Sequence, residues 1–269
     1  MSWVRHLRAI LRAAALIAWT LAIYAGLVLG LLFLFAFGIT AQRWRGFIFH
    51  LWAKASGRIP GVKVAVRGAP PAPPFLLVSN HLSYVDVLVL ASQLKCVFVA
   101  RGDVVRWPVV GSLRRGANTI FIDRENRKDV ARVNRLIDRA LGDGRGVVLF
   151  AEGTSTRGST VLPFKLSLLE QAARARLGVS YASLSYETPE SEPPGHLSVC
   201  WWREMTFMKH VLELLHLREV RAAVLFGPEL IQEDNRKALA IKLWGAVRQQ
   251  FVPVVRVKEN VALGIDNSW

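Results

Sequence analysis

An uninterrupted apolar run near the start of the chain is the strongest hydrophobic pattern in the sequence. No charged residue occurs between positions 13 and 41. A helix of that length, at about 1.5 Å per residue, is long enough to cross a hydrocarbon core of about 30 Å. A cleaved signal peptide is the alternative, but its apolar region spans only roughly 7–15 residues. The run therefore predicts a membrane-inserted helix, or a helical hairpin whose bend is eased by Gly26, Gly30 and Gly38.

A shorter amphipathic stretch follows over residues 44–57, where aromatic and basic side chains are mixed. Such a helix can lie in the bilayer interface, or it can pack on the core of a neighbouring domain. Both interpretations stay open from the sequence. We place the end of the N-terminal membrane-anchoring segment at residue 58 and assign residues 59–269 to a separate folded domain.

After a proline-rich stretch at 68–74, short apolar runs alternate with helical patterns. The runs that predict buried strands are 75–79, 96–100, 119–122, 147–150, 179–186 and 220–226. The stretches that predict helices are 84–92, 129–141, 165–176 and 236–250. Strands separated by helices favour a sheet of parallel strands. The predicted fold is therefore an α/β domain with a mixed, largely parallel sheet flanked by helices.

The charge balance indicates a partner for this fold. Lys and Arg number 35 against 20 Asp and Glu, which gives a formal net charge of +15, and 52% of the residues are hydrophobic. A basic and apolar chain points to nucleic acid or to an anionic membrane surface. The basic residues are spread along the chain and the aromatic residues concentrate in the apolar segment, which argues against nucleic acid. We therefore expect the lipid bilayer to be the partner.

The cysteines add little chemistry to the prediction. Cys96 and Cys200 are too few for a disulfide framework in a chain of 269 residues. Cys96 lies in an apolar run and is predicted to be a buried thiol. The sequence contains neither a CxxC nor an HExxH pattern, so we expect no metal site.

One heptapeptide, residues 80–86, carries a candidate catalytic pair. Ser83 suits the N-cap of the helix predicted at 84–92, and Asp86 would then occupy the N3 position of a capping-box-like pattern. His81 lies just ahead of that helix, where the Asp86 carboxylate can orient its imidazole and stabilise an imidazolium. His81 is thus a candidate general base. The alternative is that Asp86 only caps the helix and that His81 is an ordinary polar residue.

Two further blocks place polar residues at the ends of predicted strands. Glu152, Gly153 and Thr154 follow the strand at 147–150, the position where α/β folds contact ligands. Arg101 and Arg124 follow the strands at 96–100 and 119–122, and an arginine side chain can bind phosphate oxygens in bidentate fashion. Surface ion pairs are the alternative role for the two arginines. Ser155 lacks the second glycine of a nucleophile elbow, so we do not expect a serine hydrolase.

Taken in order, these blocks resemble the motifs of the glycerolipid acyltransferases, typified by bacterial 1-acylglycerol-3-phosphate acyltransferase. The family's NHxSxxD motif matches the heptapeptide at 80–86, and its F-x-EGT motif matches residues 150–154. A basic residue, a Pro-x-x-Gly stretch and FIDR match Arg101, residues 108–111 and residues 121–124. The family often has Arg directly after EGT, where this chain has Ser155, and Arg157 follows two residues later. The stretch 152–165 is more similar to a bacterial subgroup that includes lyso-ornithine lipid acyltransferases.

The resemblance implies an O-acyltransferase domain over 59–269 that needs no cofactor. The acyl group would pass from acyl-CoA or acyl carrier protein to the free hydroxyl of a lysophospholipid. The first acceptor to consider is 1-acylglycerol-3-phosphate, and lyso-ornithine lipid is the alternative. A non-catalytic membrane protein that binds lipid is a remote third possibility. The enzyme would lie in the inner (cytoplasmic) membrane, with its catalytic domain on the cytoplasmic side.

The same resemblance assigns roles to individual residues. His81 would be the general base and Asp86 would orient it. Glu152 and Gly153 would hold the glycerol part of the acceptor, and the arginines would neutralise its phosphate. The residues implied in substrate binding are Asn80, Ser83, Arg101, Arg124, Glu152, Gly153, Thr154 and Arg157.

Overall fold

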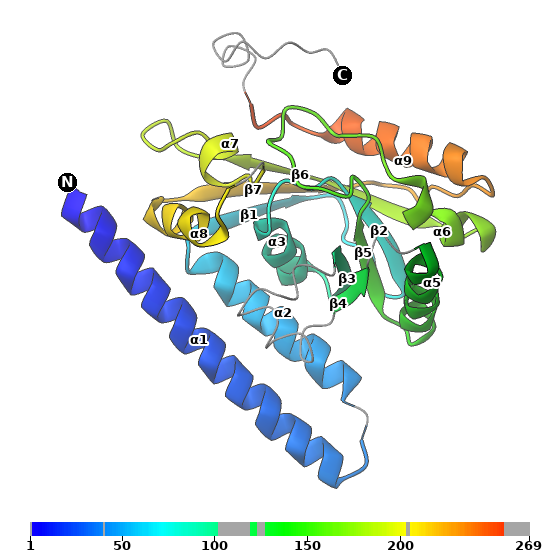
Figure 1. Ribbon diagram of the computed structural model, residues 1–269, viewed down its shortest axis with the longest axis horizontal. Coiled ribbons are helices and arrows are strands. Elements are labelled where there is room, and N and C mark those ends of the chain that lie inside the picture. The colour runs from blue at the N-terminus through cyan, green and yellow to red at the C-terminus, as the bar shows by residue number, and fades with distance from the viewer. Residues whose placement is uncertain (1, 40, 102–118, 123–126, 203–204, 256–269) are drawn as a thin grey trace.

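A computed structural model describes residues 2–39, 41–101, 119–122, 127–202 and 205–255 (Figure 1). The strands are β1 (Val62–Arg67), β2 (Phe75–Ser79), β3 (Cys96–Arg101), β4 (Thr119–Ile122), β5 (Gly146–Phe150), β6 (Val179–Glu187) and β7 (Val220–Phe226). The helices are α1 (Ser2–Ala36), α2 (Gln42–Arg58), α3 (Val85–Gln93), α5 (Arg127–Gly142), α6 (Glu170–Arg174), α7 (Gly195–Ser198), α8 (Phe207–His216) and α9 (Arg236–Gln250), with a 3₁₀ turn η2 (Leu166–Leu168).

The described strands form a single sheet in the order β1-β7-β6-β2-β5-β3-β4. The strands from β6 through β2, β5 and β3 to β4 are mutually parallel. β7 runs antiparallel to β6, and β1 pairs parallel with β7. The expected mixed, largely parallel α/β fold with a long apolar N-terminal helix is thus confirmed.

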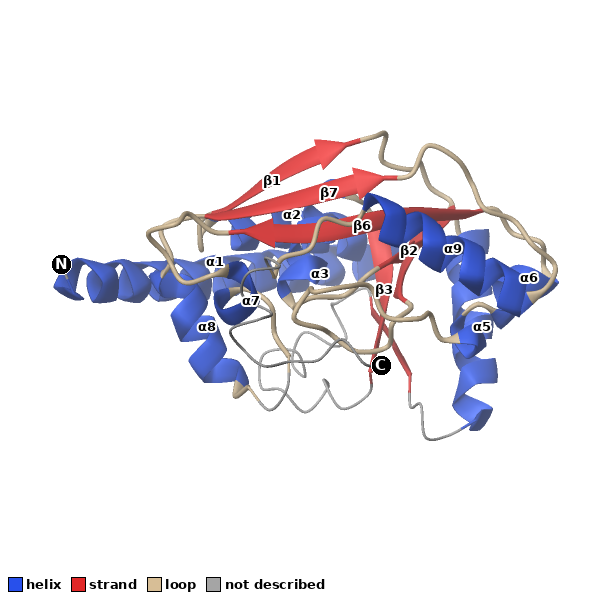
Figure 2. Cartoon of the chain, turned by 90° about the horizontal axis from the view of Figure 1, so that it is seen from above, coloured by secondary structure: helices blue, strands red, loops and turns tan. Residues whose placement is uncertain are grey.

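The centre of the sheet is buried on both faces, as the apolar runs predicted. Every residue of β2 and β5 is buried. The helices cover both faces of the sheet. α3 lies with α2 on one face and α9 covers the other (Figure 1), while α5 and α6 pack against η2. Figure 2 shows the twist that turns the β1–β7 end of the sheet away from β2 and β3.

Several elements differ from the sequence prediction, among them the short helix α7, which was not predicted. β1 was not predicted, because its alternation of apolar and basic residues (62–67) leaves it mostly exposed at the sheet edge. α8 was not predicted either, although it buries His210 and Leu214. The helix predicted at 165–176 is interrupted, since η2 and α6 are separated at Leu169.

The apolar run forms one continuous helix, α1, which includes Gly26 and Gly30, so the bend expected at these two glycines does not occur. The helix that turns back along α1 is α2, the predicted amphipathic stretch. α1 and α2 lie side by side and antiparallel, and the chain turns between them at Gly38, which has a positive φ of 65° (Figure 1). The indole of Trp44 rests against Gly30, where an added Cβ would come within 2.2 Å of the ring nitrogen. α2 also packs on α3, which is the core-packing alternative for residues 44–57.

The start of α1 is fixed to the end of α8. Arg8 donates to the carbonyl of His216, and Arg12 donates to the carbonyls of Leu215 and Leu217. These carbonyls lie at a helix C-terminus, where cationic side chains are favourable. Beyond this contact the outer side of α1 is apolar and exposed, and residues Trp3–Ala36 are long and apolar enough to cross a membrane.

We expect the exposed apolar side of α1 to bind lipid. Leu29, which is 67% exposed, should become unfavourable in a bilayer as Leu29→Arg, since an arginine at the centre of a membrane helix costs about 2.5–3.5 kcal/mol. Binding of the purified protein to lipid vesicles should fall at least about tenfold. The matched control is Leu230→Arg in the β7–α9 connection, where the leucine is 65% exposed. Equal binding by the two variants would contradict a lipid-facing α1.

Candidate active site

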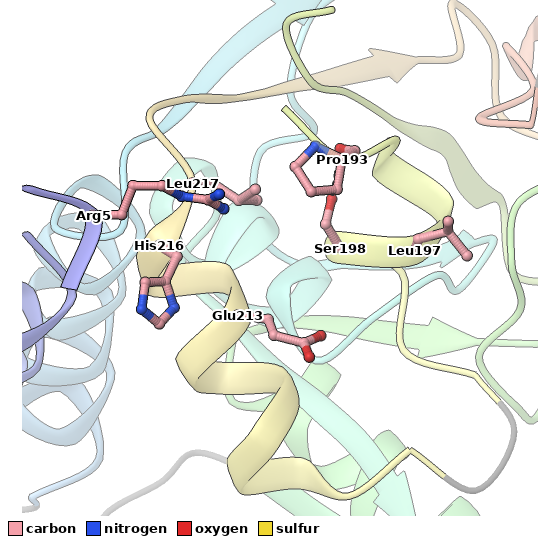
Figure 3. Close-up of a pocket in the computed structure, with 7 residues that line it drawn as sticks. All are labelled: Arg5, Pro193, Leu197, Ser198, Glu213, His216 and Leu217. Atoms are coloured by element: carbon pink, nitrogen blue, oxygen red, sulfur yellow. Dashed lines mark hydrogen bonds between the residues drawn. The ribbon is translucent and has the colours of Figure 1, made fainter. Parts of the chain in front are cut away.

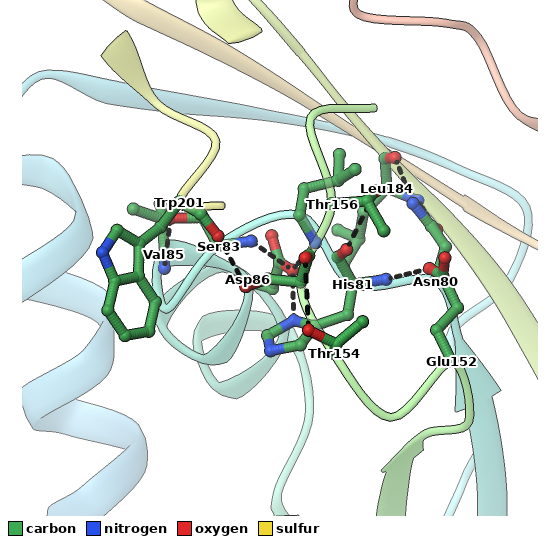
Figure 4. Close-up of polar contacts among 12 residues, drawn as sticks. Asn80, His81, Ser83, Val85, Asp86, Glu152, Thr154, Thr156, Leu184 and Trp201 are labelled. Carbon is green, nitrogen blue, oxygen red and sulfur yellow. Dashed lines mark hydrogen bonds and ion pairs between the residues drawn. The ribbon is translucent and has the colours of Figure 1, made fainter. Parts of the chain in front are cut away.

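The two best motif matches meet at one edge of the sheet. β2 and β5 are adjacent and parallel, and their last residues, Ser79 and Phe150, are directly paired. The loops that leave them therefore start side by side, one carrying His81 and the other Glu152 (Figure 4). This is the carboxyl end of parallel strands, where open α/β sheets bind their ligands.

His81 and Asp86 form a close pair. The Nδ1 atom of His81 lies 2.7 Å from Oδ2 of Asp86. Because an ionised carboxylate only accepts hydrogen bonds, Nδ1 carries the proton and Nε2 keeps its lone pair. No described group bonds to Nε2, and 21% of the His81 side chain is exposed. The imidazole also stacks on Phe150, with ring centroids 4.1 Å apart. The ring is thus held in place with its basic nitrogen accessible.

Asp86 is completely buried, and both of its oxygens are hydrogen-bonded. Besides the imidazole, Oδ2 accepts the backbone N–H groups of Leu82 at 2.6 Å and Ser83 at 3.0 Å. Oδ1 accepts the hydroxyl of Tyr186, on β6, at 2.6 Å. The side chain of Asp86 has no exposed surface. A buried carboxylate with four donors can remain charged opposite an imidazolium.

The two hydrogen bonds of the predicted capping box around Ser83 are present. The Ser83 hydroxyl accepts the N–H of Val85 at 3.3 Å, and the Asp86 carboxylate accepts the N–H of Ser83 at 3.0 Å. The helix itself starts one residue later than predicted, at Val85, so Tyr84 holds the N-cap position, and its side chain makes no capping hydrogen bond.

Asn80 and Ser83, both predicted to bind substrate, are fully buried. The Asn80 amide donates to the carbonyl of Leu184 at 2.9 Å and accepts its N–H at 2.7 Å. The pairing of β2 with β6 ends at Ser79, and beyond it the Asn80 side chain makes the hydrogen bonds to the backbone of β6. Asn80 therefore fixes the exit of the chain from β2, directly before His81.

Glu152 is also buried, and its carboxylate bonds to backbone on two sides. Oε1 accepts the N–H of His81 and Oε2 accepts the N–H of Leu162, both at 2.7 Å. Burial raises the pKa of Glu152 to about 8, against these two hydrogen bonds, which lower it. Only 1% of the residue is exposed. Both oxygens thus bond to the protein, and the contact of Glu152 with the acceptor stays a prediction.

The remaining predicted residues are Gly153, Thr154, Arg157, Arg101 and Arg124. Gly153 has a φ of 80°, a left-handed conformation that suits glycine, and Thr154 beside it is exposed. Arg157 is half-buried and its Nε lies 3.4 Å from the Ser159 hydroxyl. Arg101 ends β3, but its side chain, like all of Arg124 and residues 108–111, lies outside the described part of the chain.

Sequence reasoning missed two contributors to the site. One is Tyr186, which lies 100 positions after Asp86 in the chain. The other is the segment at Trp201, whose N–H donates to the carbonyl of Leu82 at 2.8 Å and whose carbonyl accepts the Ser155 hydroxyl at 2.5 Å. Neither belongs to a local motif. A tyrosine near the end of the strand predicted at 179–186 was the one available signal for Tyr186.

A separate cavity lies where α1, α7 and α8 meet. It has a volume of about 120 Å³ and is lined by residues of α1, α7 and α8, among them Arg5, Glu213 and His216 (Figure 3). None of its lining residues belongs to the motif blocks. The cluster around His81 therefore remains the candidate active site.

Comparison with known proteins points to one enzyme family. Residues 63–187 match the family model described as Acyltransferase. A lyso-ornithine lipid O-acyltransferase of Rhodobacter capsulatus is 36% identical over 71% of this chain and 70% of its own length. A 1-acyl-sn-glycerol-3-phosphate acyltransferase of Neisseria meningitidis is 30% identical over 68% of this chain and 71% of its own length.

Among solved structures, the crystal structure of the 1-acyl-sn-glycerophosphate acyltransferase PlsC from Thermotoga maritima superimposes with a TM-score of 0.56. The match covers 88% of this chain and 97% of PlsC at 19% sequence identity, which shows a shared fold. Together with the two sequence relatives and the motifs gathered around His81, this identifies the chain as a member of the glycerolipid acyltransferase family and as an O-acyltransferase.

Proposed function

We propose that the chain transfers a fatty acyl group from an acyl thioester to the free hydroxyl of a lyso-lipid, with His81 as the general base. The observation that carries this proposal is the His81–Asp86 pair. Its 2.7 Å contact fixes the proton on Nδ1 and leaves Nε2 able to accept one. A base must first be within reach of the proton it removes, and the exposed edge of His81 meets this condition.

The reaction needs no covalent enzyme intermediate. His81 Nε2 takes the proton of the acceptor hydroxyl as its oxygen attacks the thioester carbonyl carbon. Asp86 stabilises the imidazolium that forms. The tetrahedral intermediate then collapses, the carbon–sulfur bond breaks, and the imidazolium returns its proton to the departing thiolate. The products are the acylated lipid and the free thiol of coenzyme A or of acyl carrier protein.

For the acceptor we favour lyso-ornithine lipid, with 1-acylglycerol-3-phosphate as the second candidate. Ser155 stands directly after EGT, where the family often has arginine, and its hydroxyl is bonded to the Trp201 carbonyl. A serine held in this way supplies no positive charge for a phosphate. The Rhodobacter relative supports the same choice. Arg157 and the Neisseria relative support the second candidate.

We assign Glu152 to positioning. Its two oxygens accept the backbone N–H groups of His81 and Leu162, so that the loop after β2 is joined to the loop after β5 at His81. A direct acceptor contact through the same oxygens would compete with both bonds. The enzyme would work at the cytoplasmic face of the inner membrane, since acyl-CoA and acyl carrier protein are cytoplasmic donors and the apolar side of α1 is suited to lipid.

His81→Ala should reduce kcat about 10²–10⁴-fold, the usual contribution of a general base. The assay is turnover of acyl-CoA and of acyl carrier protein thioester by detergent-solubilised protein. His6→Ala is the control, because His6 is exposed on α1 and bonds to His216 outside the site. Full activity of the His81 variant would refute the mechanism.

Acceptor preference is tested in the same assay with two lipids. Lyso-ornithine lipid should be acylated faster than lysophosphatidate, and a soluble phosphate analogue of the acceptor should not inhibit. The reason is that Ser155 replaces the expected arginine. Turnover of lysophosphatidate alone would reverse the order of the two acceptors while leaving the His81 chemistry intact.

Glu152→Gln should lower kcat with little change in the KM of either substrate. The glutamine amide has one acceptor oxygen, so one of the two backbone N–H groups would face an NH₂ group. We expect a loss of about 10-fold or more, since an unsatisfied buried group costs about 1–3 kcal/mol. Glu170→Gln, which alters a surface ion pair, is the control. A rise in acceptor KM at constant kcat would instead favour a direct acceptor contact.

A further inference from the structure

Tyr186 contacts the oxygen of Asp86 that His81 does not use. It lies on β6 and is 4% exposed, and its hydroxyl donates to Oδ1 at 2.6 Å. Within the described part of the chain this is the one hydrogen bond on Oδ1, whereas Oδ2 carries three. Among the residues that the structure describes, Tyr186 is thus the only side chain besides His81 that bonds to this carboxylate.

The hydroxyl of Tyr186 stays protonated over the working range of an enzyme. Burial, and after it the charge of Asp86, raises the pKa of Tyr186 well above its ordinary value. The phenol therefore always donates this hydrogen bond, and the Asp86 carboxylate always accepts it. A neutral donor of this kind withdraws negative charge from the carboxylate that faces the imidazole.

Other titratable groups surround the pair from each neighbouring element. Glu152 approaches from the loop after β5, Cys200 from the segment after α7, and Tyr84 from the start of α3. Tyr84 is in turn bonded to His210 of α8 at 3.1 Å. Burial raises the pKa of the Cys200 thiol and of the Tyr84 phenol, so these two remain neutral. Glu152 is the neighbour that titrates in the same range as an imidazole.

From this arrangement we infer that Tyr186 is a positioning residue that sets the pH at which the His81–Asp86 pair takes up its proton, and with it the acidic limit of acyl transfer. The inference rests on the proposed role of His81 as base. The bond to Oδ1 fixes the rotamer that turns Oδ2 toward the imidazole. It also shares the negative charge that would otherwise hold a proton on His81, so that Nε2 is available as a base at lower pH.

Tyr186→Phe tests the inference because it removes the hydroxyl and keeps the ring. The NMR titration of the His81 ring, assigned by its loss in His81→Gln, should move to higher pH by about one unit. The acidic limb of the kcat/KM profile should move by a similar amount, while the KM values stay close to those of the unaltered protein. A merely structural role would lower activity at every pH without displacing the profile.

Two comparisons isolate the effect. Tyr181→Phe is the matched control, since Tyr181 is a half-buried tyrosine of the same strand that does not contact Asp86. The displacement caused by Tyr186→Phe should persist in the Glu152→Gln background, which separates it from the titration of Glu152. In an Asp86→Asn background it should vanish, because Tyr186 acts through the carboxylate.

A second variant covers the case in which Tyr186→Phe does not fold. Replacing Tyr186 with a fluorinated tyrosine keeps the hydroxyl and makes it a stronger donor, so the His81 titration should move to lower pH. The inference would be overturned if the His81 ring titrated at the same pH in the unaltered protein and in every Tyr186 variant that folds. If the titrations move as expected but His81→Ala is fully active, Tyr186 still controls the pair while the catalytic role of His81 fails, and the two results are thereby distinguished.

Discussion

The complete burial of the Asp86 carboxylate is the constraint on which the site depends. A charge without exposed surface is tolerated only when hydrogen bonds replace its hydration. Here the donors come from the loop after β2 and from β6. The carboxylate therefore gathers these segments around itself, and the imidazole of His81 is one of the groups it holds. The contacts that orient the imidazole of His81 are therefore among the contacts that fold this part of the chain.

The sheet brings the loops to the carboxylate before any side chain acts. Parallel pairing of β2 with β5 and with β6 directs the carboxyl ends of three strands to one edge. Asn80 extends the β2–β6 pairing by one step, and Glu152 joins the two loops through their N–H groups. Where the backbone pairing of the strands ends, these buried polar side chains bond to backbone groups in place of a neighbouring strand. We therefore expect substitutions of these two side chains to act through the position of His81.

Sequence patterns predicted the parts of this structure that depend on local chemistry. The central strands were predicted because burial on both faces makes β2 and β5 continuously apolar. The pairing of His81 with Asp86 was predicted because five positions separate them across the start of a helix. Tyr186 and the Trp201 segment were not predicted, since their contacts depend on strand order. The position of Glu152 was predicted but its two hydrogen bonds to backbone N–H groups were not, because a motif indicates where a carboxylate lies and not which way it faces.

Contacts also connect the hairpin helix α1 to the site through α8. Arg8 and Arg12 hold the last carbonyls of α8, and buried His210 of the same helix bonds to Tyr84 beside the catalytic loop. His210 donates from Nε2 to the Cys200 carbonyl at 3.2 Å, so its Nδ1 must accept the Tyr84 hydroxyl. A continuous series of contacts therefore connects α1 with the loop that carries His81. If α1 inserts into lipid as proposed, these contacts would fix the position of His81 relative to the membrane surface.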